Sequence, residues 1–260
     1  MSWTERLTLA ERVARDAGEL LRTKFGRHLQ IRSKGVRSNL VTDADTESEA
    51  LIRRAIAASF PGDAVLGEEE GLRGGGDARW IIDPLDGTTN FTHGYPLFAV
   101  SIAFESQGTV VLGVVCDPMR DELFVAVQGE AARCNGGALA VSKTADMRDA
   151  LLVTGFPPFG GGEPPNLAPF EEFMVRSQAL RRDGSAALDL CYVAAGRFDG
   201  FWEPDLHAWD IAAGALIVER AGGRVSDYRG GPAALDGRQI VASNGAIHDA
   251  MTDVLKNFAP

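Results

Sequence analysis

The sequence lacks an uninterrupted apolar run of membrane-spanning length, although 45% of its 260 residues are hydrophobic. Its first residues, which include Glu5 and Arg6, are not followed by the apolar segment of a secretory signal. Three widely spaced cysteines in apolar surroundings are also not the even set that is typical of a disulfide framework. These absences predict a cytoplasmic protein with reduced thiols and no membrane span.

A basic surface is missing as well, because 36 acidic residues outnumber 26 basic ones and give a net charge of -10. This excess argues against a broad nucleic-acid-binding surface, and we expect no nucleic-acid partner. The four histidines form no His-x-x-x-His pair, and there is no Gly-x-Ser-x-Gly sequence, which disfavours a zinc hydrolase and a serine nucleophile. The glycines of residues 71–76 match neither a P-loop nor a dinucleotide-binding fingerprint. A water activated by a metal ion is therefore the better nucleophile.

The most informative stretch is residues 80–91, in which an apolar run ends in two carboxylates: WIIDPLDGTTNF. The run is typical of the end of a buried strand. Pro84 cannot donate to a strand ladder and Gly87 tolerates unusual backbone angles, so we expect a turn with Asp83 and Asp86 close together. Crowded carboxylates raise each other's pKa unless a cation neutralises them, which favours a hard divalent metal. The alternative is a simple Asp-containing turn without a cation.

Two other segments of the chain also end in acid. Residues 65–70, with the sequence VLGEEE, read as a second strand that leads into Glu68. Residues 209–214, with the sequence WDIAAG, place Asp210 at the start of a predicted helix. Three acidic strand or helix ends in one chain strengthen the prediction of a metal site.

Periodicity predicts an amphipathic helix over residues 4–25 and a second helix that opens at a capping box of Thr46 and Glu49. Asp43 and Asp45 are expected just before that helix, where stabilisation of its dipole is the alternative role. Residues 71–76 are expected to form a mobile loop.

Further strands and helices follow along the chain. Strands are predicted at 98–104, 110–116, 123–127, 198–202, 224–226 and 239–242, and helices at 170–180, up to 195, at 209–221 and at 246–256. The first three strands should form an antiparallel meander, so an α+β class is expected. We expect residues 1–260 to be a single domain in two packed halves, about 1–145 and 146–260.

The three acidic segments, in this order, resemble the motifs of the inositol monophosphatase family of magnesium-dependent, lithium-sensitive phosphatases. The resemblance runs from about Lys34 to the C-terminus. It implies a layered α-β-α-β-α sandwich of the inositol monophosphatase and sugar phosphatase type. It also implies hydrolysis of a small phosphate monoester of a polyol or sugar, with myo-inositol 1-phosphate the leading substrate, and a homodimer.

The same resemblance implies two or three Mg²⁺ ions. Glu68, Asp83 and the carbonyl of Leu85 would hold one ion, and Asp83, Asp86 and Asp210 a second. Glu68 would reach a third, weakly held ion through water, and Lys34 would lie near it. Mg²⁺ prefers octahedral oxygen ligation and keeps several waters, one of which can serve as the nucleophile.

The resemblance implies catalytic roles for Glu68, Thr88 and Asp45. Thr88 would bond the attacking water and pass its proton towards Asp45, with Glu68 as the competing acceptor. The implied substrate-binding residues are Asp86, Gly87, Thr88, Gly184, Ser185, Ala186, Glu203 and Asp210. From the sequence alone, Glu203 beside Pro204 would be an acid on a surface loop.

Three alternative activities would use the same metal site. They are those of fructose-1,6-bisphosphatase, histidinol-phosphatase and adenosine-3',5'-bisphosphate phosphatase. Asn90-Phe91 and Glu203 favour the inositol branch. The interval from Glu68 to Asp83 is shorter than in the animal enzymes, which predicts weaker binding of the third ion and weaker inhibition by Li⁺. A function of another class is that of a partner of the transcription machinery, as in some bacterial members of the family.

Overall fold

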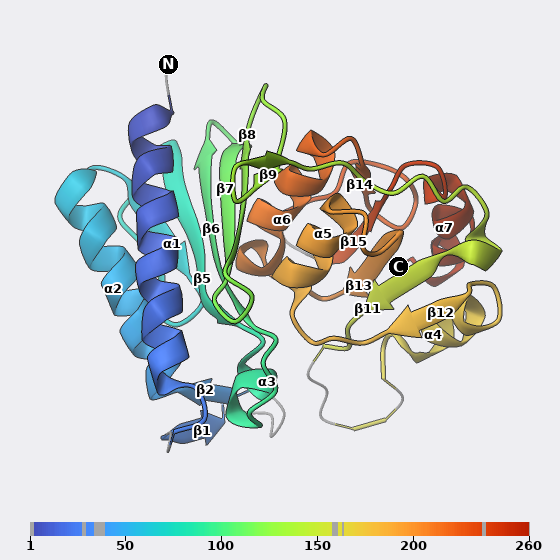
Figure 1. Ribbon diagram of the computed structural model, residues 1–260, viewed down its shortest axis with the longest axis horizontal. Coiled ribbons are helices and arrows are strands. Elements are labelled where there is room, and N and C mark those ends of the chain that lie inside the picture. Colours follow the sequence, from blue (N-terminus) through green and yellow to red (C-terminus); the bar gives the residue numbers. More distant parts are fainter. Residues whose placement is uncertain are drawn as a thin grey trace.

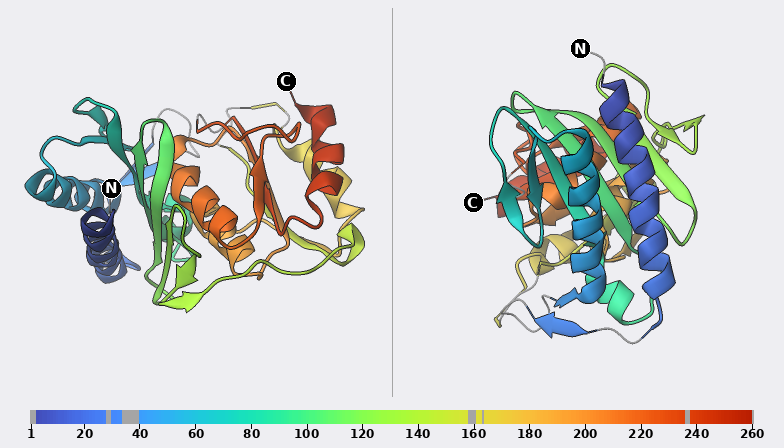
Figure 2. Two further views of the ribbon diagram at one scale, coloured as in Figure 1. Left: turned by 90° about the horizontal axis from the view of Figure 1, so that it is seen from above. Right: turned by 90° about the vertical axis from the view of Figure 1, so that its left-hand side faces the viewer.

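The computed structural model describes residues 3–27, 30–33, 40–157, 161–162, 164–235 and 238–259. Among these residues, the two larger sheets alternate with three pairs of helices, which gives five layers (Figure 1). The outer pair is α1 (Thr4–Lys24) and α2 (Asp43–Ser59), the central pair is α5 (Ala186–Ala194) and α6 (Ala208–Arg220), and the last pair is α4 (Leu167–Met174) and α7 (His248–Leu255). The order of layers is also visible from above in Figure 2. The predicted α-β-α-β-α sandwich is confirmed.

The first sheet has eight strands in the order β10-β9-β8-β7-β6-β5-β3-β4. These strands are β3 (Ala64–Gly67), β4 (Gly71–Arg73), β5 (Ala78–Asp86), β6 (Ala99–Ser106), β7 (Thr109–Asp117), β8 (Glu122–Val127), β9 (Arg133–Cys134) and β10 (Gly137–Ala138). Strands β5 to β9 pair antiparallel with their neighbours, which confirms the meander, whereas β3 runs parallel to β5. Helices cover both faces, so the central strands are apolar almost throughout instead of alternating.

The second sheet has five strands in the order β12-β11-β13-β15-β14. Its strands are β11 (Leu151–Thr154), β12 (Ala179–Arg181), β13 (Gly200–Pro204), β14 (Arg224–Ser226) and β15 (Gln239–Ser243). The short elements are the pair β1 (Ile31–Ser33) and β2 (Leu40–Thr42), the helix α3 (Thr88–Thr92), and two 3₁₀ turns, Met147–Asp149 and Lys256–Phe258. The first strand of the second sheet along the chain, β11, begins at Leu151.

Close packing of small residues joins the two sheets through α5 and α6. The nearest atoms to a Cβ placed on Gly113 of β7 would be the Cα and carbonyl oxygen of Ala213, both 2.8 Å away. A Cβ on Gly214 would likewise lie 2.6 Å from Leu190 of α5. The absence of a side chain at Gly113 lets α6 lie directly on the first sheet, and its absence at Gly214 lets α6 lie close to α5. The first turn of α6 thereby lies beside the end of β5.

Three local predictions are wrong. Helix α2 begins at Asp43, because Thr42 is its N-cap and Asp45 completes the capping box, not Thr46 and Glu49. The segment 71–76 begins with strand β4, which pairs antiparallel with β3, so its first part is an edge strand and not a loop. The helix expected at 170–180 is α4, which ends at Met174, and residues 179–181 form β12 because they pair with β11.

Three further predictions concern the state of the cysteines, a membrane-spanning helix and the position of Lys34. All three cysteines are free; Cys116 and Cys191 are buried and Cys134 is half-buried. In the part of the chain that the structure describes, no helix is long and apolar enough to cross a membrane. Lys34 lies outside the described residues, and its expected place near a metal ion stays a prediction.

Candidate metal centre and active site

Strand β5 lies between β6 and β3 and carries Asp83 and Asp86 at its C-terminal end. Residues three positions apart normally point to opposite faces of a strand. Here the register shifts between Asp83, opposite Ser101, and Asp86, opposite Ala99, so a bulge brings both carboxylates to one side. The N–H of Leu85 donates to Asp83 Oδ1 at 3.0 Å inside this bulge. The expected crowding is therefore present, but it arises from a bulged strand that continues to Asp86 and not from a turn after Ile82.

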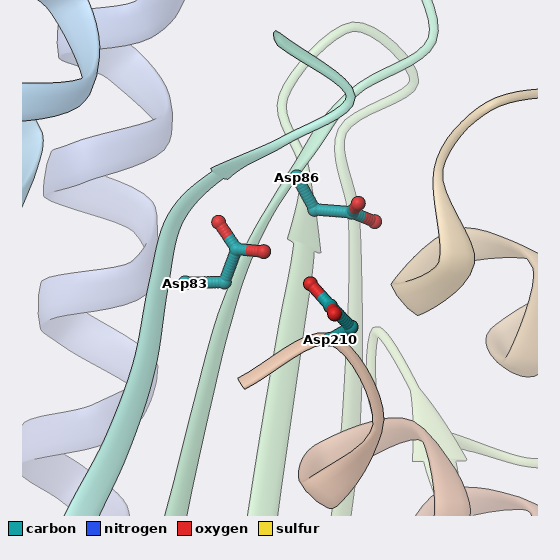
Figure 3. A group of neighbouring side chains, drawn as sticks. All are labelled: Asp83, Asp86 and Asp210. Carbon is teal, nitrogen blue, oxygen red and sulfur yellow. The ribbon is translucent and has the colours of Figure 1, made fainter. Parts of the chain in front are cut away.

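Asp210 joins these two residues from the first turn of α6. Its Oδ2 accepts a hydrogen bond from the N–H of His207 at 2.6 Å, which caps the helix and fixes the side chain. The ligand atoms of Asp83, Asp86 and Asp210 all lie within 4.8 Å of one another, and their carboxylates converge (Figure 3). The two halves of the chain thus meet in one acidic cluster.

The surroundings of the cluster raise the pKa of all three carboxyl groups. Burial raises the pKa of Asp83 well above its ordinary value, and the charges of Glu68 and Asp86 raise it further. Burial and the charge of Asp86 act in the same way on the pKa of Asp210. Burial also raises the pKa of Asp86, to about 6, although hydrogen bonds from Ser185 and Ala187 oppose this shift. Three oxygen donors that cannot all ionise without a counter-charge fit a hard divalent cation.

Glu68 follows β3 and is half-buried. Its charge raises the pKa of Asp83, Asp86 and Asp210, so it lies near the cluster. It is not a member of the group whose ligand atoms lie within 4.8 Å of one another. The structure therefore brings Glu68 towards the site but leaves its carboxylate farther out than the three aspartates.

Thr88 and Asp45 are in contact, as the resemblance implies. The hydroxyl of Thr88 lies 3.0 Å from Asp45 Oδ1 and 3.1 Å from the carbonyl oxygen of Leu85. Asp45 is completely buried, and burial raises its pKa, although hydrogen bonds from Thr42 and Thr88 oppose the shift. Gly87 is the N-cap of α3 with φ of 91°, a left-handed conformation that glycine adopts without strain.

The residues expected to line the substrate pocket are also assembled near the cluster. The Ser185 hydroxyl donates to Asp86 Oδ2 at 2.6 Å and the N–H of Ala187 donates to the same oxygen at 2.8 Å, so the start of α5 holds Asp86. Gly184 has φ of 83°, and its carbonyl oxygen accepts from Asn90 Nδ2 at 3.4 Å. Ala186 is the first residue of α5.

Glu203 differs from what its sequence neighbours suggest. It lies on β13 and only 6% of it is exposed, so it is not an acid on a surface loop. Its carboxylate fills the space that a side chain on Gly155 would need. Burial, and then the charges of Asp210 and Asp86, raise its pKa well above the ordinary value. Glu203 therefore faces the same acidic cluster from the second sheet.

The sequence profile of the inositol monophosphatase family matches residues 2–257. The chain belongs to this family. It is a phosphoric monoester hydrolase by that membership, as the motifs predicted.

Individual relatives of this family member are similar over nearly their whole length. An inositol-1-monophosphatase of Mesorhizobium japonicum is 45% identical over 255 residues, which cover 96% of this chain and 96% of that protein. The Nus factor SuhB of Pseudomonas aeruginosa is 43% identical over 264 residues, which cover 98% of this chain and 97% of that protein. The crystal structure of the extragenic suppressor protein suhB from Bartonella henselae has a TM-score of 0.91 and 41% identity, and covers 97% of this chain and 98% of that chain.

One buried acid of this inositol monophosphatase family member escaped the sequence reasoning. Asp189 of α5 is 1% exposed, and neither carboxyl oxygen has a hydrogen-bond partner among the described residues. Burial raises its pKa well above the ordinary value, and the charges of Asp183 and Glu203 add to the shift. The only signal in the sequence is spacing, since Asp189 stands four residues after Ser185 and so shares its helix face.

Proposed function

We propose that this protein hydrolyses a small phosphate monoester with Mg²⁺ as cofactor, and that myo-inositol 1-phosphate, converted to inositol and phosphate, is its leading substrate. The observation that carries the proposal is the convergence of Asp83, Asp86 and Asp210 within 4.8 Å. Burial and mutual repulsion raise their pKa values, and a bound divalent cation would relieve this repulsion. The name of the M. japonicum relative supports the choice of substrate.

In this proposal Glu68, Asp83 and the Leu85 carbonyl hold one ion, and Asp83, Asp86 and Asp210 hold a second. Mg²⁺ bound there would neutralise the phosphate and lower the pKa of a water. Glu68 would contact a third ion through water. Because the ligands come from both halves of the chain, we infer that residues 1–260 act as one phosphatase domain.

The chain's own residues would move the proton of the attacking water. Because the Thr88 hydroxyl donates to Asp45, its oxygen is left to accept a hydrogen bond from water. Burial raises the pKa of Asp45, which makes its carboxylate a better proton acceptor than an exposed aspartate. Glu68 is the competing acceptor. The N–H groups of Gly87 and Thr88, at the start of α3, would bind phosphate oxygens.

Other residues would recognise the leaving alcohol. Glu203 is buried beside the cluster and would accept hydrogen bonds from polyol hydroxyls, while Gly184 and Ala186 would line the pocket. Ser185 would act through Asp86, whose carboxylate it already binds. The protein is proposed to work as a homodimer, which light scattering after size-exclusion chromatography tests directly.

The decisive experiment measures phosphate release from a panel of substrates with Mg²⁺ and with EDTA. The panel contains inositol 1-phosphate, fructose 1,6-bisphosphate, histidinol phosphate and adenosine 3',5'-bisphosphate. We expect the highest kcat/KM for inositol phosphate, no turnover in EDTA, and stronger inhibition by Li⁺ than by Na⁺. A higher kcat/KM for another member of the panel would assign that compound as the substrate instead. Absence of turnover on all four would overturn the proposal.

A second candidate function is contact with the transcription machinery. It is favoured by the Nus factor SuhB of P. aeruginosa, which is 43% identical over 98% of this chain. Purification of the tagged protein from its own cells and detection of RNA polymerase subunits test this function. A polymerase-free preparation, obtained at low salt, would argue against it.

A further inference from the structure

Glu49 and Arg53 of α2 form a buried ion pair that binds the backbone before and after Glu68. Glu49 is 1% exposed, and its Oε2 accepts the N–H of Glu69 at 2.8 Å while its Oε1 accepts the N–H of Glu70 at 3.0 Å. Arg53, one helical turn later, donates from Nε to Glu49 Oε1 at 2.7 Å. The two side chains therefore act as one unit, which we call the Glu49–Arg53 clamp.

The arginine of the clamp extends the contacts to the flanking strands. Arg53 Nη2 donates to the carbonyl oxygen of Gly71 at 2.6 Å, and Nη1 donates to that of Val65 at 3.3 Å. Val65 belongs to β3, before Glu68, and Gly71 begins β4, after it. The planar guanidinium thus joins both ends of the hairpin that presents Glu68.

Gly67 gives independent evidence for this close approach. A Cβ at Gly67 would lie 2.6 Å from Glu49 Oε1 and 2.8 Å from Arg53 Nη2. The residue directly before Glu68 is therefore packed against the clamp, and any side chain there would push the clamp away. The backbone at positions 67, 69 and 70 is held from one side by α2.

The same face of α2 also reaches the other motif of the first half. Asp45 contacts the Thr88 hydroxyl, and the Ser48 hydroxyl donates to the carbonyl oxygen of Pro84 at 2.8 Å. Asp45, Ser48 and Glu49 have the three- and four-residue spacing of one helix face. One rigid helix therefore sets the position of the β5 bulge relative to the Glu68 hairpin.

We infer that Glu49 and Arg53 are positioning residues of the metal centre, which hold Glu68 at the distance from Asp83 that cation binding requires. This inference rests on the proposed role of Glu68 as a metal ligand. The Glu68 side chain extends from the backbone between Gly67 and Glu69, so a movement of this backbone would move its carboxylate relative to the aspartate cluster. Neither positioning residue contacts substrate in this scheme. Both act through the hairpin.

The first test uses the metal-free protein and the variant Glu49→Gln. Amide hydrogen exchange, resolved by NMR, is measured at Glu69 and Glu70 in EDTA. Because a charged acceptor is lost, exchange at these two amides should accelerate by about tenfold or more. The matched control is Glu172→Gln, which breaks an exposed Glu–Arg pair of the same spacing with Arg176 on α4. It should leave both amides unchanged.

The second test measures Mg²⁺ binding by calorimetry and the Mg²⁺ dependence of phosphate release. Glu49→Gln should raise the dissociation constant and the half-saturating Mg²⁺ concentration by about tenfold, with kcat at saturating Mg²⁺ within about threefold of wild type. Arg53→Lys keeps the charge but loses the fork, so its shift should be smaller. Glu172→Gln should behave as wild type.

The outcomes separate this inference from the proposed function. Unchanged amide exchange in Glu49→Gln would overturn it, and so would faster exchange with unchanged Mg²⁺ affinity, since the clamp would then be purely structural. If Glu49→Gln does not fold, Arg53→Lys decides by the same two measurements. If the wild type binds Mg²⁺ but releases no phosphate, the proposed function fails, while the exchange and calorimetric data still decide on the clamp.

Discussion

Asp210 has two tasks, because it caps α6 through His207 and also faces Asp83 and Asp86. Asp210→Asn keeps an amide oxygen for the cap but removes one negative charge from the cluster. We expect phosphate release with Mg²⁺ to fall by about a hundredfold or more, because a metal ligand is weakened. The metal-free variant should melt at a higher temperature than the wild type, because repulsion among buried carboxylates is relieved.

The measurements for Asp210→Asn are turnover with Mg²⁺ and thermal unfolding in EDTA. The control is Asp249→Asn, which removes an exposed acid from the first turn of α7 and should leave turnover unchanged. Turnover of Asp210→Asn close to that of the wild type would contradict the metal assignment.

Glu203 is the residue on which substrate selectivity is expected to depend. With Mg²⁺ bound beside it, Glu203 would be ionised despite the burial that raises its pKa, and a charged acceptor that bonds a hydroxyl contributes about 1.5–3 kcal/mol. Glu203→Gln should therefore reduce kcat/KM for inositol phosphate by about ten- to a hundredfold. Glycerol 2-phosphate has fewer hydroxyls that Glu203 could bind, so kcat/KM for this substrate should fall less. An equal loss for both substrates would instead assign Glu203 to support of the metal site.

At the scale of elements, the position of Asp210 depends on how closely α6 approaches β7. Gly113→Ala would place a Cβ 2.8 Å from backbone atoms of Ala213, which cannot rotate away. The helix must then move outwards, at a cost of about 1–3 kcal/mol in the free energy of unfolding. Because α6 carries Asp210, the half-saturating Mg²⁺ concentration should rise as well.

Urea unfolding of Gly113→Ala and Gly62→Ala separates crowding from the general effect of replacing glycine. A Cβ at Gly62 would meet nothing within 4 Å, so this control should change the free energy of unfolding by less than about 0.5 kcal/mol. If Gly113→Ala is as stable as the control and binds Mg²⁺ equally well, the helix–sheet distance does not limit the site.

For the whole molecule, acid stability should depend on His248. This fully buried residue lies between the hydroxyls of Ser226 at 2.8 Å and Ser243 at 2.9 Å. Burial, followed by the charge of Arg224, lowers its pKa to about 4. Between pH 6.5 and 4 the unfolded chain binds a proton at His248 that the folded protein does not bind. The contribution of neutral His248 to the free energy of unfolding is therefore lost as the pH falls through that window.

The variant His248→Gln has no titratable group at this position, so comparison with the wild type measures how much His248 contributes to the pH dependence of stability. The stability advantage of wild type over variant should shrink by about 2 kcal/mol between pH 7 and pH 5. Urea unfolding at both pH values measures it, and the cluster carboxyls cancel because both proteins contain them. A difference that stays constant with pH would show that folding does not shift the pKa of His248.

Local signals in the sequence determined much of the fold and of the candidate site. Helix α1, the antiparallel meander and the second-half strands follow from apolar periodicity and turn residues, which act over a few positions. The acid-ended segments around Glu68, Asp83 and Asp210 were also visible, because each apolar run ends in a carboxylate and the three occur in one chain. With the family resemblance, these segments predicted the layered fold and the enzyme class.

Tertiary structure decided what depends on contacts between distant segments. The bulge between Asp83 and Asp86 is defined only by its pairing with β6, and β4 exists as a strand only because it pairs with β3. Glu203 is buried because β13 lies inside the second sheet, although its sequence neighbours suggest a loop. Glu49 looks like a solvated helix residue in the sequence, and only the fold places its carboxylate against the backbone of Glu69 and Glu70, since hydrogen bonds across about twenty residues leave no periodic signal.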